Sequence, residues 1–143
     1  MFLITILSDS ATWISPWINR LLADWTKSGY QVNLTHKAVE VTKGDFCFIL
    51  SYSEVVKQDI LCRNKHNLVV HESDLPKGKG WSPLSWQILE GKNTIVVTLF
   101  EATEKVDSGA IYLQEDIQFR GNELVDELRQ KQADVTIGLC KKF

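Results

Sequence analysis

The chain has 143 residues, of which 44% are hydrophobic and 24% are charged, which is typical of a single globular domain with its own core. Its formal net charge of −2 predicts no basic face, so nucleic acid is not an expected partner. No apolar run is long enough to cross a membrane, and the apolar start lacks the positive leader of a signal peptide.

The three cysteines are odd in number and scattered, which favours a reducing, cytoplasmic setting over a disulfide scaffold. Cys47, Cys62 and Cys140 form no pair with the spacing of a zinc site, so no metal is expected. Cys47 lies within an apolar run, and we expect a core residue there rather than a nucleophile.

Strand and helix patterns alternate through the first half of the chain. The predicted strands are residues 2–7, 31–35, 45–50 and 68–70. A helix is predicted from an N-cap at Ser15, with Pro16 behind it, to a stop at Gly29. A second, short helix is predicted over residues 53–62, with Val55, Val56 and Ile60 pointing inward.

The second half continues this alternation. Ser82 followed by proline predicts the start of a helix over 84–90, which Gly91 ends. Residues 94–100 are a predicted strand, and 110–113 and 117–119 are predicted to be paired or edge strands. Asn122 is expected to cap a final helix that turns Leu124, Leu128, Val135 and Leu139 inward.

Continuous apolar strands that alternate with helices predict a three-layer α/β/α domain with a mostly parallel sheet. We expect residues 1–143 to form one such domain, since no linker-like segment is seen within them. The final residues, 134–143, are typical of a helix still in progress, which fits a domain truncated at its C-terminus as well as a minimal one. The sequence leaves the oligomeric state open.

Two ionisable residues stand at the ends of predicted strands, where ligands bind in such folds. His71 ends one strand, and Asp107 follows another in a Ser-Gly turn. In one cleft these two side chains would handle protons. Taken alone, His71 is also compatible with a satisfied strand-end histidine, and Asp107 with a simple turn residue.

One stretch carries several motifs in a fixed order. The central run is Val69-Val70-His71-Glu72-Ser73-Asp74-Leu75-Pro76. It is followed by the basic glycine loop 77–80, then by Pro83-Leu84-Ser85-Trp86, Thr98 and Asp107-Ser108-Gly109. Residues 46–114 thereby resemble the folate-dependent formyltransferases, which include methionyl-tRNA, glycinamide and amino-sugar enzymes. The resemblance implies a Rossmann-like formyltransferase fold.

The resemblance places His71 and Asp107 on two of the three catalytic positions of the family. The third, an asparagine whose amide donates a hydrogen bond to the oxyanion, is Val69 here. Loss of one such donor typically costs about two to three powers of ten in rate. Asn67 lies on the same strand face but roughly 7 Å further back, so Ser73 or a backbone N–H is the alternative donor.

The resemblance also implies a site for the formyl donor, N10-formyltetrahydrofolate. The loop that contains Glu54, Val55 and Val56 corresponds to the segment whose backbone receives the pterin ring, and Lys105 to the opposite wall. A purely structural role for the two valines is the alternative. Thr98 matches a supporting position of the family.

Several charged residues are specific to this chain. Glu72 replaces the proline of the family motif and Asp74 an apolar residue, so this extra acid either holds an ammonium group before attack or is solvated. Lys77 and Lys79 either meet a phosphate or carboxylate or belong to a solvated loop.

The expected function is transfer of a formyl group to a primary amine. The turn after the first strand, residues 8–12, has no glycine, which argues against a ribose-phosphate acceptor. The length and charge argue against tRNA, so an amino sugar, nucleotide-linked, is left by elimination. A non-catalytic folate- or sugar-binding domain, favoured by Val69, and a formyltetrahydrofolate hydrolase are the alternatives.

Overall fold

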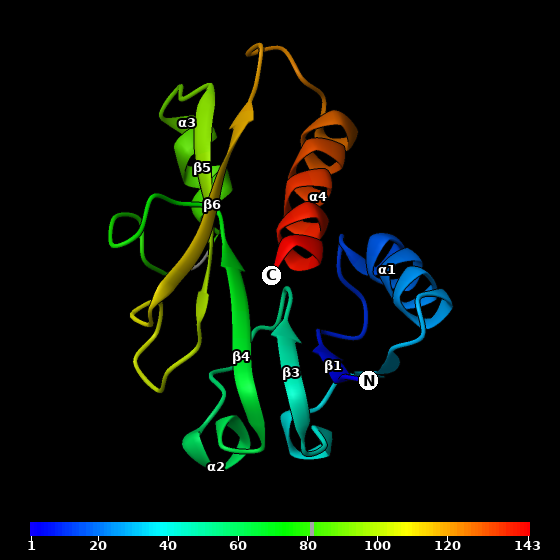
Figure 1. Cartoon of the computed structure of the whole chain (residues 1–143). Coiled ribbons are helices and arrows are strands. Elements are labelled where there is room, and N and C mark those ends of the chain that lie inside the picture. Colours follow the sequence, from blue (N-terminus) through cyan, green and yellow to red (C-terminus); the bar gives the residue numbers. More distant parts are fainter. Residues whose placement is uncertain (81) are drawn as a thin grey trace.

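A computed structural model describes residues 1–80 and 82–143, which form one six-stranded sheet with helices on both faces (Figure 1). The strands, in sheet order, are β2 (Gln31–Thr35), β1 (Leu3–Leu7), β3 (Gly44–Ile49), β4 (Asn64–His71), β5 (Thr94–Glu101) and β6 (Ile111–Gln118). The first four are mutually parallel, and β5 and β6 are antiparallel to their neighbours. The predicted mostly parallel α/β fold is therefore confirmed.

The larger core lies on one face of the sheet, beneath α1 (Ser15–Lys27) and α4 (Val125–Lys142), which run side by side (Figure 1). Ile18 and Leu21 of α1 and Leu139 of α4 are almost completely buried there, because apolar residues at helical spacing form one stripe. The opposite face is covered by the short helix α2 (Gln58–Leu61) and by the turn η1 (Ala38–Glu40). A further helix, α3 (Pro83–Leu89), follows β4 in the chain.

Two of the three predicted helix starts are wrong in detail. Ser15 is the first residue of α1 rather than its cap, because its Oγ accepts a hydrogen bond from the backbone N–H of Thr12 (3.2 Å) in the preceding turn. Ser82 is the cap residue of α3 and Pro83 its first residue, as predicted, although the backbone of Ser82 is left-handed (φ 53°) and its side chain makes no capping hydrogen bond. Leu124, not Asn122, is the cap residue of α4, and with 73% of its surface exposed it does not point inward.

Two other predicted elements are also corrected. The helix predicted over residues 53–62 is confined to α2, and Val55 is 51% exposed, although Val56 and Ile60 are buried as expected. The two strands predicted over 110–113 and 117–119 are one strand, β6 (Ile111–Gln118), because its pairing with β5 continues through the polar residues between them. An edge strand tolerates such residues on its solvent side.

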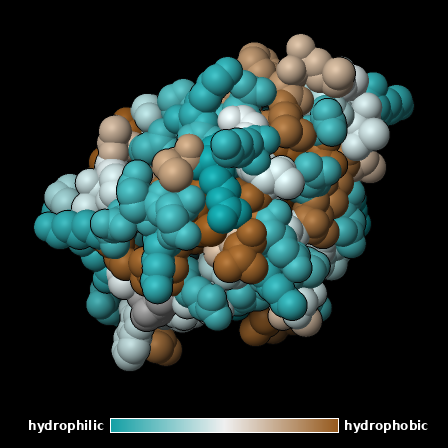
Figure 2. Space-filling model, turned by 90° about the horizontal axis from the view of Figure 1, so that it is seen from below, coloured by the Kyte–Doolittle hydropathy of each residue, from teal (hydrophilic) through white to brown (hydrophobic). Residues whose placement is uncertain are grey.

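The surface seen from below in Figure 2 is largely hydrophilic, and its hydrophobic residues form separate patches. In the part of the chain that the structure describes, no helix combines the length and the apolar character needed to cross a membrane.

Candidate functional site

A cavity of about 380 Å³ opens at the carboxyl ends of β1, β3 and β4. Successive strand residues face opposite sides of a sheet, so this cavity extends around the strand ends onto both faces. One part, the α2 half, is lined by Ile49, Val56, Val69 and Ala102. The other part, the α4 half, is lined by Ile14, Leu50, Val70, Leu84 and Thr136.

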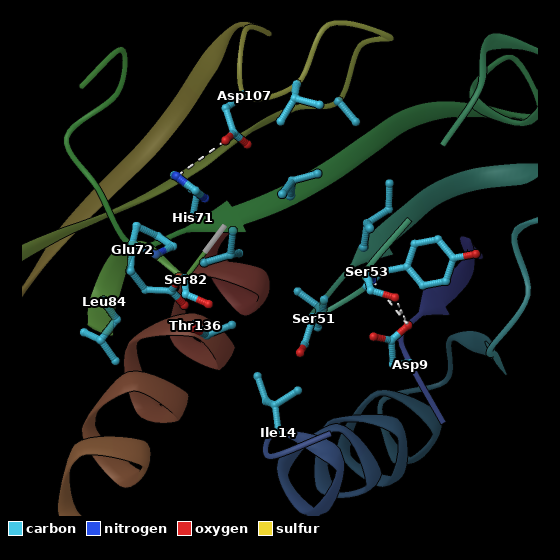
Figure 3. A pocket seen from close by; sticks show the side chains of 18 of the residues that line it. Asp9, Ile14, Ser51, Ser53, His71, Glu72, Ser82, Leu84, Asp107 and Thr136 are labelled. Atoms are coloured by element: carbon cyan, nitrogen blue, oxygen red, sulfur yellow. Dashed lines mark hydrogen bonds and ion pairs between the residues drawn. The ribbon is translucent and has the colours of Figure 1, made fainter. Parts of the chain in front are cut away.

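His71 and Asp107 meet on the wall of this cavity (Figure 3). Oδ2 of Asp107 lies 3.5 Å from Nε2 of His71, and both side chains are more than nine-tenths buried. The same oxygen accepts a hydrogen bond from the backbone N–H of Gly80 (2.9 Å). The glycine loop after β4 and the loop after β5 are thereby joined at the histidine.

The His71 ring is oriented by a backbone carbonyl. Nε2 lies 2.7 Å from the carbonyl oxygen of Gly78, and because a carbonyl only accepts, Nε2 carries the proton and donates it. In the neutral ring the lone pair is then on Nδ1. His71 is therefore arranged to accept a proton at Nδ1 while Gly78 and Asp107 hold its other nitrogen.

The local sequence explains how Asp107 reaches this position. Asp107 adopts a left-handed backbone conformation (φ 54°), which aspartate tolerates better than most residues. Two residues later the chain passes so close to β5 that a Cβ on Gly109 would lie 1.6 Å from the carbonyl oxygen of Glu101. The Asp-Ser-Gly turn thus needs its glycine for close backbone approach.

Val69 lines the cavity two residues before His71, on the same face of β4. Asn67, the next residue back on that face, does not line the cavity. Its side-chain amide donates to the carbonyl of Leu61 (2.7 Å) and is buried. The α2 half therefore presents a methyl-bearing side chain at the position that the resemblance assigns to an amide donor.

Glu54, Val55 and Val56 all line the α2 half of the cavity. They belong to a loop rather than to a helix, because the preceding residue, Ser53, is hydrogen-bonded to Asp9, which follows the end of β1. Oδ1 of Asp9 accepts hydrogen bonds from the backbone N–H (3.3 Å) and hydroxyl (3.2 Å) of Ser53 (Figure 3). This arrangement leaves the loop backbone beside the cavity.

The other three candidate residues do not line the cavity. Lys105 is exposed, and its neighbours Thr103 and Val106 line the wall instead. Thr98 and Ser73 are buried behind the site, where the Thr98 hydroxyl donates to the Ser73 carbonyl (2.7 Å). The two residues thus anchor the loop after β4, and Ser73 is not placed to serve as an oxyanion donor.

The α4 half contains polar residues that the sequence reasoning missed. Oε1 of Glu72 accepts a hydrogen bond from the amide of Gln132 (2.7 Å), whose own oxygen accepts from Nη1 of Arg129 (2.8 Å). Arg129 lies over the ring of Trp13, 4.8 Å from its centre, and Thr136 lies one turn beyond Gln132. The spacing of 129, 132 and 136 places three polar residues on one helix face, which is the signal that could have been read.

Glu72 and Asp107 lie on opposite sides of the His71 position in Figure 3, with Glu72 toward Thr136. Burial raises the pKa of the Glu72 carboxyl, and the opposing effects of the Gln132 hydrogen bond and of the His71 charge are smaller. Glu72 is thus partly shielded from solvent and bonded to Gln132, which favours a role at the cavity over full solvation.

Cys47 is buried in β3, where desolvation raises its pKa to about 12, as expected for a core cysteine. Among residues 1–80 and 82–143, no group of three or more side chains of metal-ligating type comes together.

Comparison with known proteins agrees with this geometry. Residues 14–139 match the formyl transferase family. The chain belongs to this family. It is 36% identical over 101 residues to the bifunctional polymyxin resistance protein ArnA of Wigglesworthia glossinidia brevipalpis. That match covers 70% of this chain but 15% of ArnA, and the chain spans about a third of the methionyl-tRNA formyltransferases that it matches.

Solved structures of formyltransferases share the fold. Methionyl-tRNA formyltransferase from Clostridium thermocellum superposes with a TM-score of 0.79 at 18% identity, over 99% of this chain and 66% of that one. PseJ from Anoxybacillus kamchatkensis was solved with UDP-4,6-dideoxy-4-formamido-L-AltNAc and tetrahydrofolate. It superposes with a TM-score of 0.71 at 21% identity, over 96% of this chain and 71% of PseJ. The Rossmann-like formyltransferase fold and the family are thus confirmed.

Proposed function

We propose that this chain transfers a formyl group from N10-formyltetrahydrofolate to a primary amine carried by a nucleotide-linked sugar. One observation carries the proposal: His71, held by Gly78 and Asp107, stands on the wall of a cavity that reaches both faces of the sheet. Such a cavity gives a donor and an acceptor separate approaches to one proton-handling group.

The α2 half suits the pterin of the donor. Its walls are the apolar side chains Ile49, Val56, Val69 and Ala102, and the loop 52–56 brings backbone groups to its rim. Flat heteroaromatic ligands are bound in this way, between apolar walls with a few polar groups to fix orientation. The cavity volume of about 380 Å³ lies within the range of small-molecule sites.

The bound donor would supply the formyl carbon that the amine attacks, and tetrahydrofolate would be the leaving group. Nδ1 of His71 takes the proton that the attacking amine must lose, and Gly78 and Asp107 stabilise the positive charge that the ring then carries. Val69 offers no hydrogen bond to the carbonyl oxygen as it becomes negative. We therefore expect slow turnover compared with a site that has an amide there.

The sugar acceptor is supported by three observations. The turn after β1, residues 8–12, has no glycine to wrap a phosphate, and the net charge of −2 gives no attraction to tRNA. PseJ, with the same fold, was solved in complex with a UDP-linked formamido sugar and tetrahydrofolate. Val69 favours a second candidate, folate binding without turnover.

Calorimetric titration with a stable 10-formyltetrahydrofolate analogue tests the proposal. We expect saturable binding by the wild-type chain and by His71→Ala and Asp107→Asn, because both residues act on the reaction rather than on the pterin. Formyl transfer to amino sugars should fall about a hundredfold or more in both variants. Absence of analogue binding at millimolar concentration would overturn the proposal, and binding without any transfer would leave the second candidate.

A further inference from the structure

The α4 half of the cavity has a polar lining that the mechanism above does not use. Glu72, Gln132 and Thr136 all reach it, and they come from two segments that are distant in the sequence. Gln132 and Thr136 are 3% exposed, and Glu72 is half-buried. Polar side chains are seldom buried beside a cavity unless they are satisfied there.

Glu72 is only partly satisfied in this setting. Its Oε1 accepts one hydrogen bond, from Gln132, whereas an ionised carboxylate can accept about four. Arg129 donates to the oxygen of Gln132 and makes no direct ion pair with Glu72, although its charge and that of a protonated His71 both lower the pKa of the carboxyl from further away. Among the described residues, no cation contacts the carboxylate of Glu72 directly, whereas buried charges in proteins are normally paired.

Thr136 provides a second, independent observation. Its Oγ1 is buried and has no hydrogen-bond partner among the described residues, although a helical threonine can usually bond the carbonyl four residues earlier. The side chain lines the same cavity as Glu72 (Figure 3). A ligand group that bears hydrogen-bond donors would satisfy both side chains at once.

We infer that Glu72 and Thr136 form the acceptor subsite, where the carboxylate of Glu72 binds the ammonium group of an amino sugar and Thr136 accepts from a hydroxyl or amine. The inference rests on the proposed function and names a specificity-determining residue for it. An ammonium ion supplies the missing positive charge and up to three donors. A neutral sugar supplies only hydroxyl groups and should bind much more weakly.

Calorimetric titration of the whole chain with glucosamine, and separately with N-acetylglucosamine, tests this inference. The two sugars share a ring but only the first carries an ammonium group. We expect glucosamine to bind at least tenfold more tightly to the wild-type chain. Glu72→Gln, which keeps the shape and the Gln132 contact, should abolish that preference, and Thr136→Val should weaken glucosamine about threefold to tenfold.

Two controls separate this inference from the proposed function. Asp134→Asn removes an exposed carboxylate from the same helix and should change neither titration. Glu72→Gln should still bind the formyltetrahydrofolate analogue. If the wild-type chain binds the analogue but shows no preference for glucosamine, or keeps its preference in Glu72→Gln, the subsite is wrong and the proposed function stands. If the analogue does not bind while the glucosamine preference depends on Glu72, the subsite stands and folate chemistry falls.

Discussion

Val69 and His71 lie two residues apart on one face of β4, and both line the α2 half of the cavity. The strand therefore presents an apolar side chain beside the group that handles protons. Side chains two positions apart on a strand point to the same face of the sheet, about 7 Å apart along the strand. An amide at position 69 would therefore extend into the α2 half of the cavity, beside His71.

Val69→Asn should accelerate formyl transfer, because it supplies the missing donor to the developing oxyanion. A rate increase of about tenfold to a hundredfold is expected, which is less than the effect of an optimally positioned oxyanion donor. Release of tetrahydrofolate from the formyl donor in the presence of glucosamine measures the rate. Val69→Leu has nearly the shape of asparagine without the amide, so equal rates in the two variants would contradict the prediction.

Gly109→Ala should destabilise the loop that carries Asp107. The new Cβ would lie 1.6 Å from the carbonyl of Glu101, so the backbone must move, at a cost of about 1–3 kcal/mol in the free energy of unfolding. Gly138→Ala in α4 is the matched control, since nothing lies within 4 Å of its Cβ. Urea unfolding should show Gly138→Ala more stable by about 0.5–1 kcal/mol, and equal effects would refute the argument.

The sheet and the main helices could be predicted because their signals are local. β1 and β3 are continuous apolar runs, and α1 has an apolar stripe at helical spacing. The loop 51–56 could not be predicted in this way. Its conformation is fixed by Asp9, a residue 44 positions away from Ser53, and local propensity carries no trace of that contact.

The candidate site also has one part that local sequence signals predict and one part that depends on contacts between distant residues. The His71 and Asp107 positions could be predicted because each belongs to a short motif at a strand end. The α4 half could not, because Glu72 and Gln132 are 60 positions apart and meet only when α4 packs on the sheet. Lys105 was expected at the wall, but the turn of the loop directs Val106 there instead.

The three thiols should differ sharply in reactivity. Burial raises the pKa of Cys47 and of Cys140 to about 12, whereas Cys62 is exposed. Because the thiolate is the reactive form, a disulfide reagent at about pH 8 should modify one thiol rapidly in the folded chain and three in denaturant. Cys62→Ser should remove the rapid reaction. A second rapid equivalent would show that the core opens more readily than the packing indicates.

Glu72 should make the stability of the fold depend on pH, with a sign opposite to that of most carboxylates. Burial holds its pKa in the folded chain above the ordinary value of 4.5, so over the interval between the two values the folded chain retains a proton that the unfolded chain has lost. Below pH 4.5 Glu72 is protonated in both states and does not lower the free energy of unfolding. As the pH rises through the folded-state pKa, the free energy of unfolding declines.

Glu72→Gln removes this ionisation and keeps a side chain of the same shape beside Gln132. We expect the variant to gain stability relative to the wild-type chain as the pH is raised from about 4.5 to about 8, measured by urea unfolding at several pH values. Asp134→Asn, at an exposed position on the same helix, should show no such trend. A variant whose relative stability falls with rising pH would mean that Glu72 is ionised and stabilising in the folded chain. A gain in stability together with loss of glucosamine preference would instead show that the chain maintains a destabilising buried acid for the binding of its acceptor.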